Sequence, residues 1–423
     1  MMQTVLWIPE TLAGFPVFGV GLVLAAWVFV AVAITAYQYR AHGWSNDLAS
    51  QLGIFALIAG AIVFLAPNLM EGEPGHRFFA IRGFGVMLLL AIVSGVGISA
   101  YRAKQVGIDP ELIFELAFWS ILWGVIGARV FYVIQYWHEF EAPTLAASIG
   151  KMVNAAKGGL VVYGSVIGGF TAGYLYLRKK NIPVWKLADI VAPGMILGQA
   201  IGRLGCFMNG CCYGGLCTLP FAVSFPPTSP VYVEQQKEGL FHGLELREVD
   251  DQVVIANVQP SGPAERAGLK VGDRVQKING AKIEGLDDAR NRLLLAGPEV
   301  ELVTAENQTA RWTLARLPAW SLPVHPTQIY SFLDAAILCL FLWAYYPYRR
   351  RDGEVFALLV TLHPISRFLL ELIRTDEPGR FGTGLTISQL FSIAFFLGAC
   401  GLWWWLETRG TPVKDATVTP SAA

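Results

Sequence analysis

The sequence predicts an all-α polytopic membrane protein of about nine transmembrane helices, with a small α+β domain inserted between the sixth and seventh helix. Of its 423 residues, 54% are hydrophobic and only 15% are charged, and the mean hydropathy is +0.47. Soluble domains carry about 25% charged residues, so this composition favours the bilayer. A single long stretch, about 243–318, is charged throughout and interrupts the apolar pattern.

The predicted helices are apolar stretches long enough to cross a hydrocarbon core of about 30 Å at 1.5 Å per residue. They cover 15–37, 51–68, 79–100, 111–137, 159–178, 187–207, 328–347, 354–373 and 386–407. A single stretch of this kind can be a buried helix of a soluble protein. So many of them in one chain favour membrane spans.

The basic residues predict the orientation of these spans. They fall in alternate loops: Arg40; Arg102 and Lys104; Arg178, Lys179 and Lys180; Arg349, Arg350 and Arg351. By the positive-inside rule these loops are cytoplasmic, which places the N-terminus and the 208–327 segment outside and the C-terminus inside. No basic residue precedes the first apolar run, so we expect no cleaved signal peptide.

The inserted segment has the pattern of a small soluble domain. Short alternating stretches predict strands at 253–258, 274–279, 300–305 and 311–317. The sequence SGPAERAGLKVGDRVQKINGAKI resembles the bacterial PDZ domain, with a short helix at Pro263–Ala267 and a turn at Asn279–Gly280. The resemblance implies a groove that binds a peptide by strand addition, so an envelope-protein peptide is a candidate partner. A closed structural insert without a ligand is the alternative.

Three arginines lie at a similar depth, toward the outer leaflet, within predicted spans: Arg129, Arg203 and Arg367. A charged side chain at the membrane centre costs about 2.5–3.5 kcal/mol on insertion scales, so each needs a partner. Arg203 can also snorkel to the headgroups, and Glu371 is a candidate partner for Arg367 one helical turn away. A shared external anion accounts for all three, and a phospholipid phosphate suits the guanidinium fork.

Glycines flank these polar positions at helical spacing. Gly164 and Gly168, Gly169 and Gly173, and Gly198 and Gly202 form small-x3-small pairs. Such pairs allow the backbones of neighbouring helices to approach closely. The pattern predicts tight helix packing, which is compatible with a site between the helices.

Five motifs in order now identify a resemblance to the prolipoprotein diacylglyceryl transferase family. They are GARVFYV (127–133), GGLVVYGSVIGG (158–169), GRLGCFMNGCCYGG (202–215), VHPTQIYS (324–331) and SRFLLELIRTDE (366–377). The resemblance covers about 79–240 and 319–408, a seven-helix core. It leaves two additional spans in 1–78, the PDZ-like insert at 243–318 and a cytoplasmic tail at 409–423.

The resemblance implies a bacterial cytoplasmic-membrane enzyme. This family transfers diacylglyceryl from phosphatidylglycerol to the lipobox cysteine thiol in the signal peptide of a prolipoprotein, and releases glycerol phosphate. By motif match, Arg203, Asn209 and Gly214 lie at the headgroup, Arg367 is the essential arginine and Arg129 a supporting cation. The outer wall is then formed by His325, Gln328 and Tyr330. Because arginines can stabilise the departing phosphate, no metal or other cofactor is expected.

The chain departs from the family pattern at four positions. Tyr163 replaces the family histidine, Cys206 and Cys211 replace an asparagine and a glutamate, and His363 stands where the family has tyrosine. One Tyr/His pair is thus exchanged between two helices. We hypothesise that His363 supplies the imidazole from the opposite wall, one turn from Arg367. The alternative is a packed histidine beside the kink at Pro364.

The cysteines leave several roles open. Four of them, Cys206, Cys211, Cys212 and Cys217, fall within twelve residues on the predicted outer side. Their spacing suits no standard zinc or iron–sulfur site, which leaves structural or disulfide roles first, then a thiol acceptor or redox role, and a metal last. Cys339 and Cys400 lie mid-span and are expected to pack.

Two functions compete. The retained arginines and the H-P-T-Q-I-Y motif favour the lipid-dependent transferase, or a paralogue with another acceptor. The Tyr163, Cys206 and Cys211 departures favour an inactive, lipid-binding anchor whose PDZ-like domain recruits envelope proteins. Lysine plus arginine equal aspartate plus glutamate at 32 each, so no general basic field favours nucleic acid as a partner.

Overall fold

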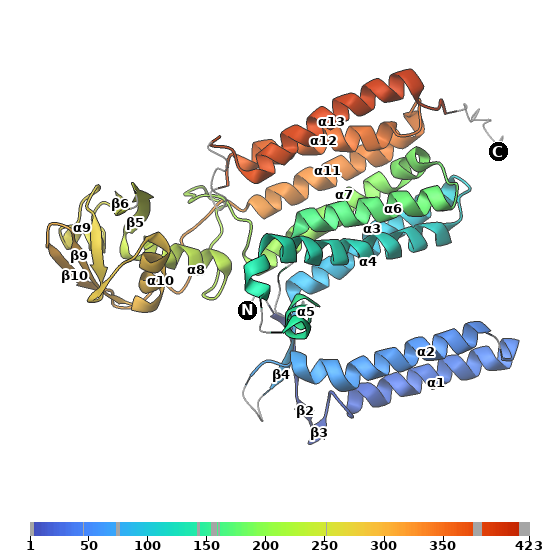
Figure 1. Cartoon of the computed structure of the whole chain (residues 1–423), viewed down its shortest axis with the longest axis horizontal. Coiled ribbons are helices and arrows are strands. Elements are labelled where there is room, and N and C mark those ends of the chain that lie inside the picture. The colour runs from blue at the N-terminus through green and yellow to red at the C-terminus, as the bar shows by residue number, and fades with distance from the viewer. Residues whose placement is uncertain are drawn as a thin grey trace. The chain divides into compact units, whose positions relative to one another are not determined.

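The computed structural model describes residues 4–44, 46–72, 77–141, 144–153, 159, 161–250, 252–374 and 383–413 (Figure 1). The chain divides into two compact units, Met1–Val86 and Met87–Ala423. Each unit is described by itself.

The first unit combines a helical pair with short strands. Strand β1 (Thr4–Pro9) pairs antiparallel with β4 (Phe78–Arg82), and β2 (Thr11–Leu12) pairs with β3 (Phe15–Pro16). Helices α1 (Leu22–His42) and α2 (Asn46–Gly60) lie side by side, and α2 continues through η1 (Ala61–Leu65) and η2 (Ala66–Leu69) (Figure 1). The two predicted helices form. The strands were not predicted, and α1 begins later than residue 15 because Phe15 and Pro16 pair in β3.

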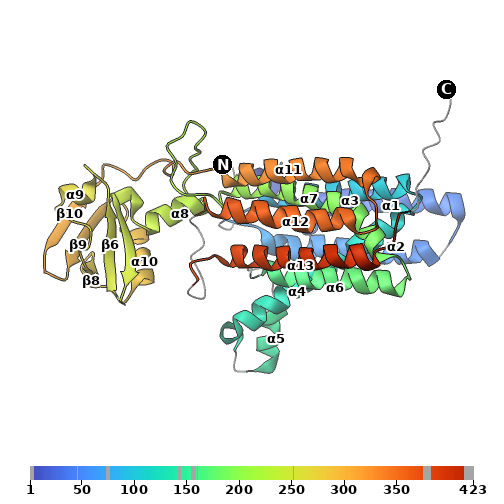
Figure 2. The same ribbon diagram turned by 90° about the horizontal axis from the view of Figure 1, so that it is seen from above.

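The second unit contains a bundle of long helices that run alongside one another (Figures 1 and 2). Its membrane-type helices are α3 (Gly83–Gln105, whose first turn belongs to the first unit), α4 (Pro110–Gln135), α6 (Val162–Lys179), α7 (Val184–Asn209), α11 (Thr327–Tyr345), α12 (Glu354–Glu371) and α13 (Ile387–Arg409). Short elements connect them: η3 (Trp137–Phe140), α5 (Leu145–Val153), α8 (Pro230–Lys237), η4 (Leu240–His242) and η5 (Tyr346–Tyr348).

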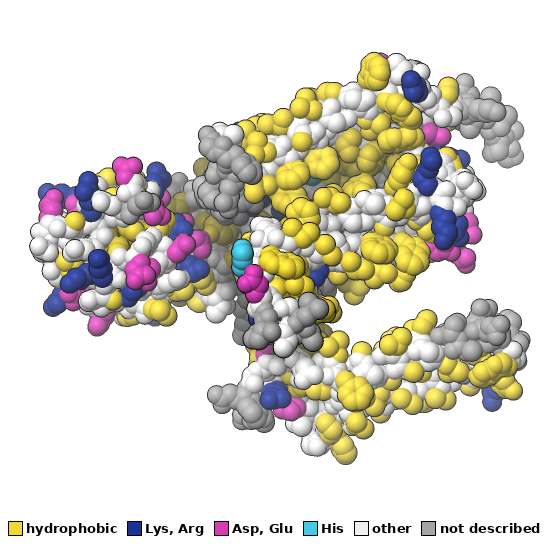
Figure 3. Space-filling model, viewed as in Figure 1, with side chains coloured by type: hydrophobic (Ala, Val, Ile, Leu, Met, Phe, Trp, Pro, Cys, Tyr) yellow, Lys and Arg dark blue, Asp and Glu magenta, His cyan; other side chains and the backbone are white. Residues whose placement is uncertain are grey.

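Seven helices of the described chain are long and apolar enough to cross a membrane: Leu22–Arg40, Gln51–Leu69, Gly83–Gln105, Pro110–Gln135, Val184–Asn209, Thr327–Tyr348 and Ile387–Arg409. The other two predicted stretches also form helices, α6 and α12. Each has 18 residues and carries glycines or polar side chains along its length. Hydrophobic side chains cover the visible face of the bundle, as expected for contact with lipid (Figure 3).

Glycines set the closest helix contact, that between α4 and α6. A methyl group at Gly127 or Gly164 would clash with the backbone carbonyl of the other, and one at Gly168 with the carbonyl of Trp123. On α7, Gly198 lies near the carbonyl of Ala91, whereas Gly202 faces open space among the described residues. Four of the six glycines singled out in the sequence therefore allow α6 to approach α4 closely: Gly164, Gly168, Gly169 and Gly173. Gly202 makes no such contact among the described residues.

The cysteines within α11 and α13 differ from each other. Cys339 is buried, and its thiol donates to the carbonyl of Pro193 within α7 at 3.3 Å. Cys400 is exposed on α13, so the prediction that it packs within the chain was wrong.

The segment between α7 and α11 contains a second hydrophobic core. Strands β10 (Thr309–Thr313), β9 (Glu299–Thr304), β7 (Val275–Ile278) and β8 (Ala281–Lys282) form one sheet in that order. Strands β5 (Leu244–Val249) and β6 (Gln252–Val258) form a separate pair, and α9 (Pro263–Arg266) and α10 (Leu286–Ala296) complete the region. Its fully buried side chains include Ile255, Leu293 and Leu302.

The sequence located most of this region. The four predicted strands correspond to β6, β7, β9 and β10, the last ending at Thr313 rather than 317. Asn279 and Gly280 both have positive φ, as the predicted turn requires. Strand β5 and helix α10 were not predicted.

Candidate functional site

The charged residues of α12 form a network with the start of α13. Arg367 forms an ion pair with Glu371 one turn later and donates to Ser388 Oγ at 3.0 Å. Glu371 also pairs with Arg374 Nη1 at 3.4 Å and accepts from Thr386 Oγ1 at 3.2 Å. The sequence-based pairing of Arg367 with Glu371 is therefore confirmed. Because the Glu371 side chain is fully buried, it fixes both guanidinium groups.

Arg203 brings a third guanidinium to this network from α7. Arg203, Arg367 and Arg374 lie close enough for mutual electrostatic repulsion to act on Arg367. Arg203 is half-buried, and it forms no hydrogen bond or ion pair with any residue that the structure describes. Glu371 pairs with Arg367 and Arg374, and Arg203 adds a surplus positive charge near Arg367 for which the described residues offer no ion-pair partner, so an anion can neutralise it.

Arg129 takes a different set of partners. Its guanidinium donates to three backbone carbonyls, those of Met152 at 2.7 Å, Gly159 at 2.9 Å and Lys151 at 3.0 Å. It also lies 5.4 Å from the ring centre of Tyr132. These bonds tie the end of α5 and Gly159 to α4. Arg203 and Arg367 therefore lie in one electrostatic neighbourhood. Arg129 instead anchors the segment between α4 and α6 to α4.

The loop after α7 carries Gly214, one of the predicted headgroup residues, and is attached to the ends of two helices. Gly214 N donates to His325 O at 2.9 Å, and Gly214 also forms a bridge with Arg374. A Cβ at Gly214 would come within 2.7 Å of the His325 Cβ and 2.8 Å of Thr327 Cγ2. Only glycine therefore lets the loop pass between the start of α11 and the end of α12.

The predicted wall residues hold this loop. Gln328 is fully buried, and its amide donates to Cys211 O at 2.7 Å. Its own Oε1 has no hydrogen-bond partner among the described residues. His325 Nδ1 lies 3.2 Å from the Tyr330 hydroxyl. Asn209, the last residue of α7, contacts the Cys211 thiol.

His363 lies on the same helix as Arg367 and close to it. Its Nε2 lies 3.2 Å from Gln199 Nε2 on α7, while its Nδ1 is buried with no hydrogen-bond partner among the described residues. Arg203, Arg367 and Asp334 all act electrostatically on the ring. Asp334, on α11, accepts from Ser366 Oγ at 2.7 Å. The imidazole is therefore surrounded by polar groups rather than packed against apolar side chains only.

Tyr163 lies in the first turn of α6. Its ring stacks on that of Phe391 of α13, with the ring centres 4.3 Å apart and an angle of 16° between the planes. The contact joins α6 to the helix that carries Ser388. Tyr163 is thus positioned by aromatic packing.

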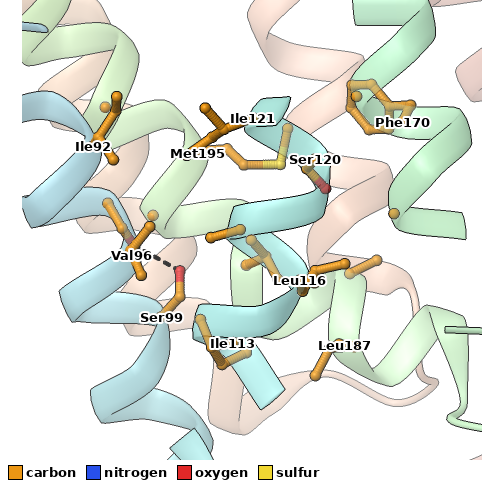
Figure 4. Close-up of a pocket in the computed structure, with 18 of the residues that line it drawn as sticks. Ile92, Val96, Ser99, Ile113, Leu116, Ser120, Ile121, Phe170, Leu187 and Met195 are labelled. Carbon is orange, nitrogen blue, oxygen red and sulfur yellow. Dashed lines mark hydrogen bonds between the residues drawn. The ribbon is translucent and has the colours of Figure 1, made fainter. Parts of the chain in front are cut away.

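An apolar pocket of about 670 Å³ lies between α3, α4, α6 and α7 (Figure 4). Side chains such as Ile92, Ile121, Phe170 and Met195 line it, and its few polar atoms belong to serines such as Ser99, which bonds its own helix. The α7 lining extends to Gly198. Arg203 follows five residues later, a rise of about 7.5 Å along the helix.

Three residues of this site escaped the sequence analysis. Arg374 follows the end of α12, seven residues after Arg367 in the same arginine-containing motif. Asp334 is a carboxylate inside an apolar span, a pattern that usually marks function. Gln199 is an amide in another such span. Each signal was visible, but only the fold brings the three helices together.

The long apolar helices, the arginines near Glu371 and the apolar pocket are features of a polytopic membrane protein. A family model described as prolipoprotein diacylglyceryl transferase matches residues 76–405, more than half of the chain. The chain therefore belongs to the prolipoprotein diacylglyceryl transferase family.

Individual relatives agree with the family match. A phosphatidylglycerol–prolipoprotein diacylglyceryl transferase of Rhodopirellula baltica is 34% identical over 93% of this chain and 87% of its own length. The enzyme of the same name from Clostridium tetani is 26% identical over 74% of this chain and 88% of its own. That from Trichormus variabilis is 34% identical over 39% of this chain and 56% of its own.

Proposed function

We propose that this chain transfers a diacylglyceryl group from phosphatidylglycerol to the thiol of a prolipoprotein lipobox cysteine. The reaction forms a thioether at a glycerol carbon and releases glycerol phosphate. The observation that carries the proposal is that Arg203 and Arg374 lie near Arg367, which pairs with Glu371, in a chain of this family. A phosphate bound there neutralises the surplus charge.

The chemistry asks for these groups. The carbon–oxygen bond to the phosphate breaks as the thiolate attacks, so negative charge grows on the leaving phosphate. Guanidinium groups already fixed by Glu371 and Ser388 can stabilise that charge without reorganising. Arg203, which has no described protein partner, is the residue with a free fork for the headgroup. The acyl chains of the lipid are proposed to lie in the pocket that approaches Arg203 along α7.

We propose that His363 removes the proton from the lipobox thiol. His363 would thereby replace the family histidine, whose position on the opposite wall is occupied by Tyr163 in this chain. The buried Nδ1 of His363, without a described partner, is the group expected to meet the thiol, since buried polar atoms in folded chains are otherwise paired. Gln199 and the Ser366–Asp334 pair would fix the ring and its charge. Arg129, Asn209, Gly214, His325, Gln328 and Tyr330 are proposed to shape the substrate site through the loop contacts described above.

The Tyr/His exchange is tested with purified protein, phosphatidylglycerol and a lipobox peptide. We expect His363→Asn to lose transfer activity, while Tyr163→Phe, which keeps the ring stack on Phe391, keeps most of it. Loss of activity in Tyr163→Phe together with full activity in His363→Ala would refute the exchange.

The proposed topology places the basic loops in the bacterial cytoplasm, and the N-terminus and residues 243–318 outside. On this topology the site lies in the outer leaflet, where a lipoprotein precursor emerges. Fusions of a periplasm-dependent reporter after residue 250 and after residue 413 test it. Activity is expected for the first fusion only.

A second candidate function concerns the inserted region. We propose that it is PDZ-like and receives an extended peptide from an envelope protein along β5, which pairs on one side only, with β6. In the alternative to catalysis, this recruitment is the main task and the helical core is a lipid-binding anchor. The replacements at Tyr163, Cys206 and Cys211 are the observations that favour this alternative.

Complementation of a bacterium depleted of its own transferase separates the two functions. We expect the full chain to rescue growth and lipoprotein maturation, Arg203→Ala to fail, and a chain lacking 243–318 to retain transferase activity. Equal rescue by Arg203→Ala and the parent would favour the anchor.

A further inference from the structure

Three cysteine thiols gather at the end of α7. Cys206 lies in the last turn of the helix, and Cys211 and Cys212 lie in the turn that follows. Their three Sγ atoms all lie within 4.8 Å of one another, and all three residues are half-buried as free thiols. The proposed transfer reaction assigns none of them a task, although two of them replace polar residues of the family signature.

The backbone holds these thiols together at a conformational cost. Gly210 ends α7 in the left-handed region and returns its N–H to Cys206 O at 2.9 Å. Cys212 has a φ of 59°, which a non-glycine residue adopts only under constraint. The constraint comes from α11, since Thr327 Oγ1 donates to Cys212 O and Gln328 Nε2 to Cys211 O, each at 2.7 Å. The thiols are therefore fixed in position before any ligand arrives.

We propose that Cys206, Cys211 and Cys212 form a binding site for a soft metal cation, with Cu(I) as the best fit. Metal–thiolate bonds of about 2.3 Å in a trigonal plane separate the sulfurs by roughly 4.0 Å, which lies within the limit of 4.8 Å on the three Sγ separations here. Zn²⁺ takes four ligands, and the described residues offer no fourth His, Cys, Asp or Glu to this group. Soft thiolate ligands favour Cu(I), zinc and iron–sulfur clusters, and of these Cu(I) fits a site with three thiolates and no described fourth ligand.

The surrounding charge supports thiolate ligands. Arg203 and Arg374 place positive charge near the Cys212 thiol. Three thiolates and one Cu(I) carry a net charge of −2, which nearby positive charge favours. Metal binding would release thiol protons and leave the loop geometry unchanged.

The test uses the full chain, purified in detergent with its thiols reduced, and Cu(I) supplied from a chromogenic Cu(I) chelator. We expect a single Cu(I) to bind with three sulfur neighbours by X-ray absorption. Cys206→Ser, Cys211→Ser and Cys212→Ser should each weaken binding by more than about 100-fold, because even changes beyond the ligands themselves cost 10- to 100-fold. The matched controls Cys217→Ser, Cys339→Ser and Cys400→Ser should bind as the parent does.

Several results would refute the proposed Cu(I) site. Controls that lose as much affinity as the three ligand variants would show adventitious thiol binding. A sulfur count below three, with only two of the cysteines needed, would refute the three-thiolate arrangement. Mapping of a disulfide from Cys206 to Cys211 or Cys212 that re-forms in the presence of Cu(I) would assign the cluster to redox chemistry. Thermal unfolding of every variant separates loss of the metal from loss of the fold.

Discussion

Each end of α7 carries a cluster of charged residues, and the two clusters differ in whether their charges have partners within the protein. Asp189 lies near its start and Arg203 near its end, about 21 Å apart along the helix. Asp189 is fully buried and accepts from Gly353 N at 2.7 Å and Phe356 N at 2.9 Å, with Arg349 Nε at 3.5 Å. The carboxylate thereby satisfies the free N–H groups at the start of α12 and neutralises one arginine.

Neighbouring cations at the Asp189 end are likewise engaged by the protein. Arg102 donates to Trp343 O at 2.9 Å and lies 3.5 Å from the Trp343 ring centre, and Arg349 lies 3.8 Å from the Tyr346 ring centre. At the other end Glu371 pairs with Arg367 and Arg374, and Arg203 lies near Arg367 without a described partner. We call the first cluster the complete end, because Arg102 and Arg349 each have a protein partner. We call the second the incomplete end, and the unpartnered Arg203 supports the anion site proposed there.

The largest expected effect on stability lies at the complete end. Asp189→Asn should lower the free energy of unfolding by about 3–5 kcal/mol, because it removes the buried countercharge of Arg349 and leaves only the more exposed Asp352. Thermal unfolding in detergent measures the loss. Asp352→Asn, which removes a more exposed partner of the same arginine, is the control and should cost much less. Equal losses would mean that the burial of Asp189 has no special role.

At the incomplete end the expected effect is on activity. Arg203→Ala should lower the transfer rate by about 100- to 1,000-fold, the usual cost of removing one donor that stabilises developing charge. The unfolding temperature should stay within the error of the parent, since Arg203 forms no described hydrogen bond or ion pair. A fall in stability as large as that of Asp189→Asn would erase the distinction between the two ends.

A substitution away from both ends of α7 provides a reference for the comparison. Gly164→Ala should destabilise the chain by about 1–3 kcal/mol, because its methyl group meets the backbone of Gly127 and forces α4 and α6 apart. Gly97→Ala on α3, where a methyl group meets open space, is the matched control and should be neutral or stabilising. Equal thermal unfolding of the two variants would contradict the close packing.

The smallest effect is expected for Ser388→Ala, which removes one hydrogen bond from Arg367. The loss should be about 0.5–1.5 kcal/mol in transition-state stabilisation, or roughly a 2- to 12-fold lower rate, because Glu371 still holds the guanidinium. Kinetics with phosphatidylglycerol vesicles measure it. A loss as large as that of Arg203→Ala would show that Ser388 contacts the substrate directly.

The helices were predictable and their polar contacts were not. All nine apolar stretches form helices, and Arg367 with Glu371 could be paired from a spacing of four residues. Arg203 and Arg129 look alike in the sequence, each a late arginine in an apolar span. The structure separates them, since Arg129 donates to backbone carbonyls of the following connection and Arg203 faces α12. The spacing of residues in the sequence shows which side chains share one face of a helix. It does not show which neighbouring helix that face contacts.

The sequence alone therefore determined the membrane class, the order of the helices, the soluble insert and the family. Hydropathy, turn residues and short motifs are local properties, and each can be recognised within a few tens of residues. Only the tertiary structure decided that Arg374 and Asp334 join the site and that three cysteine thiols converge. Arg374, Asp334 and the cysteine turn come from three segments of the chain. Their arrangement depends on helix packing and on the attachment of the turn to α11, which joins residues more than a hundred positions apart.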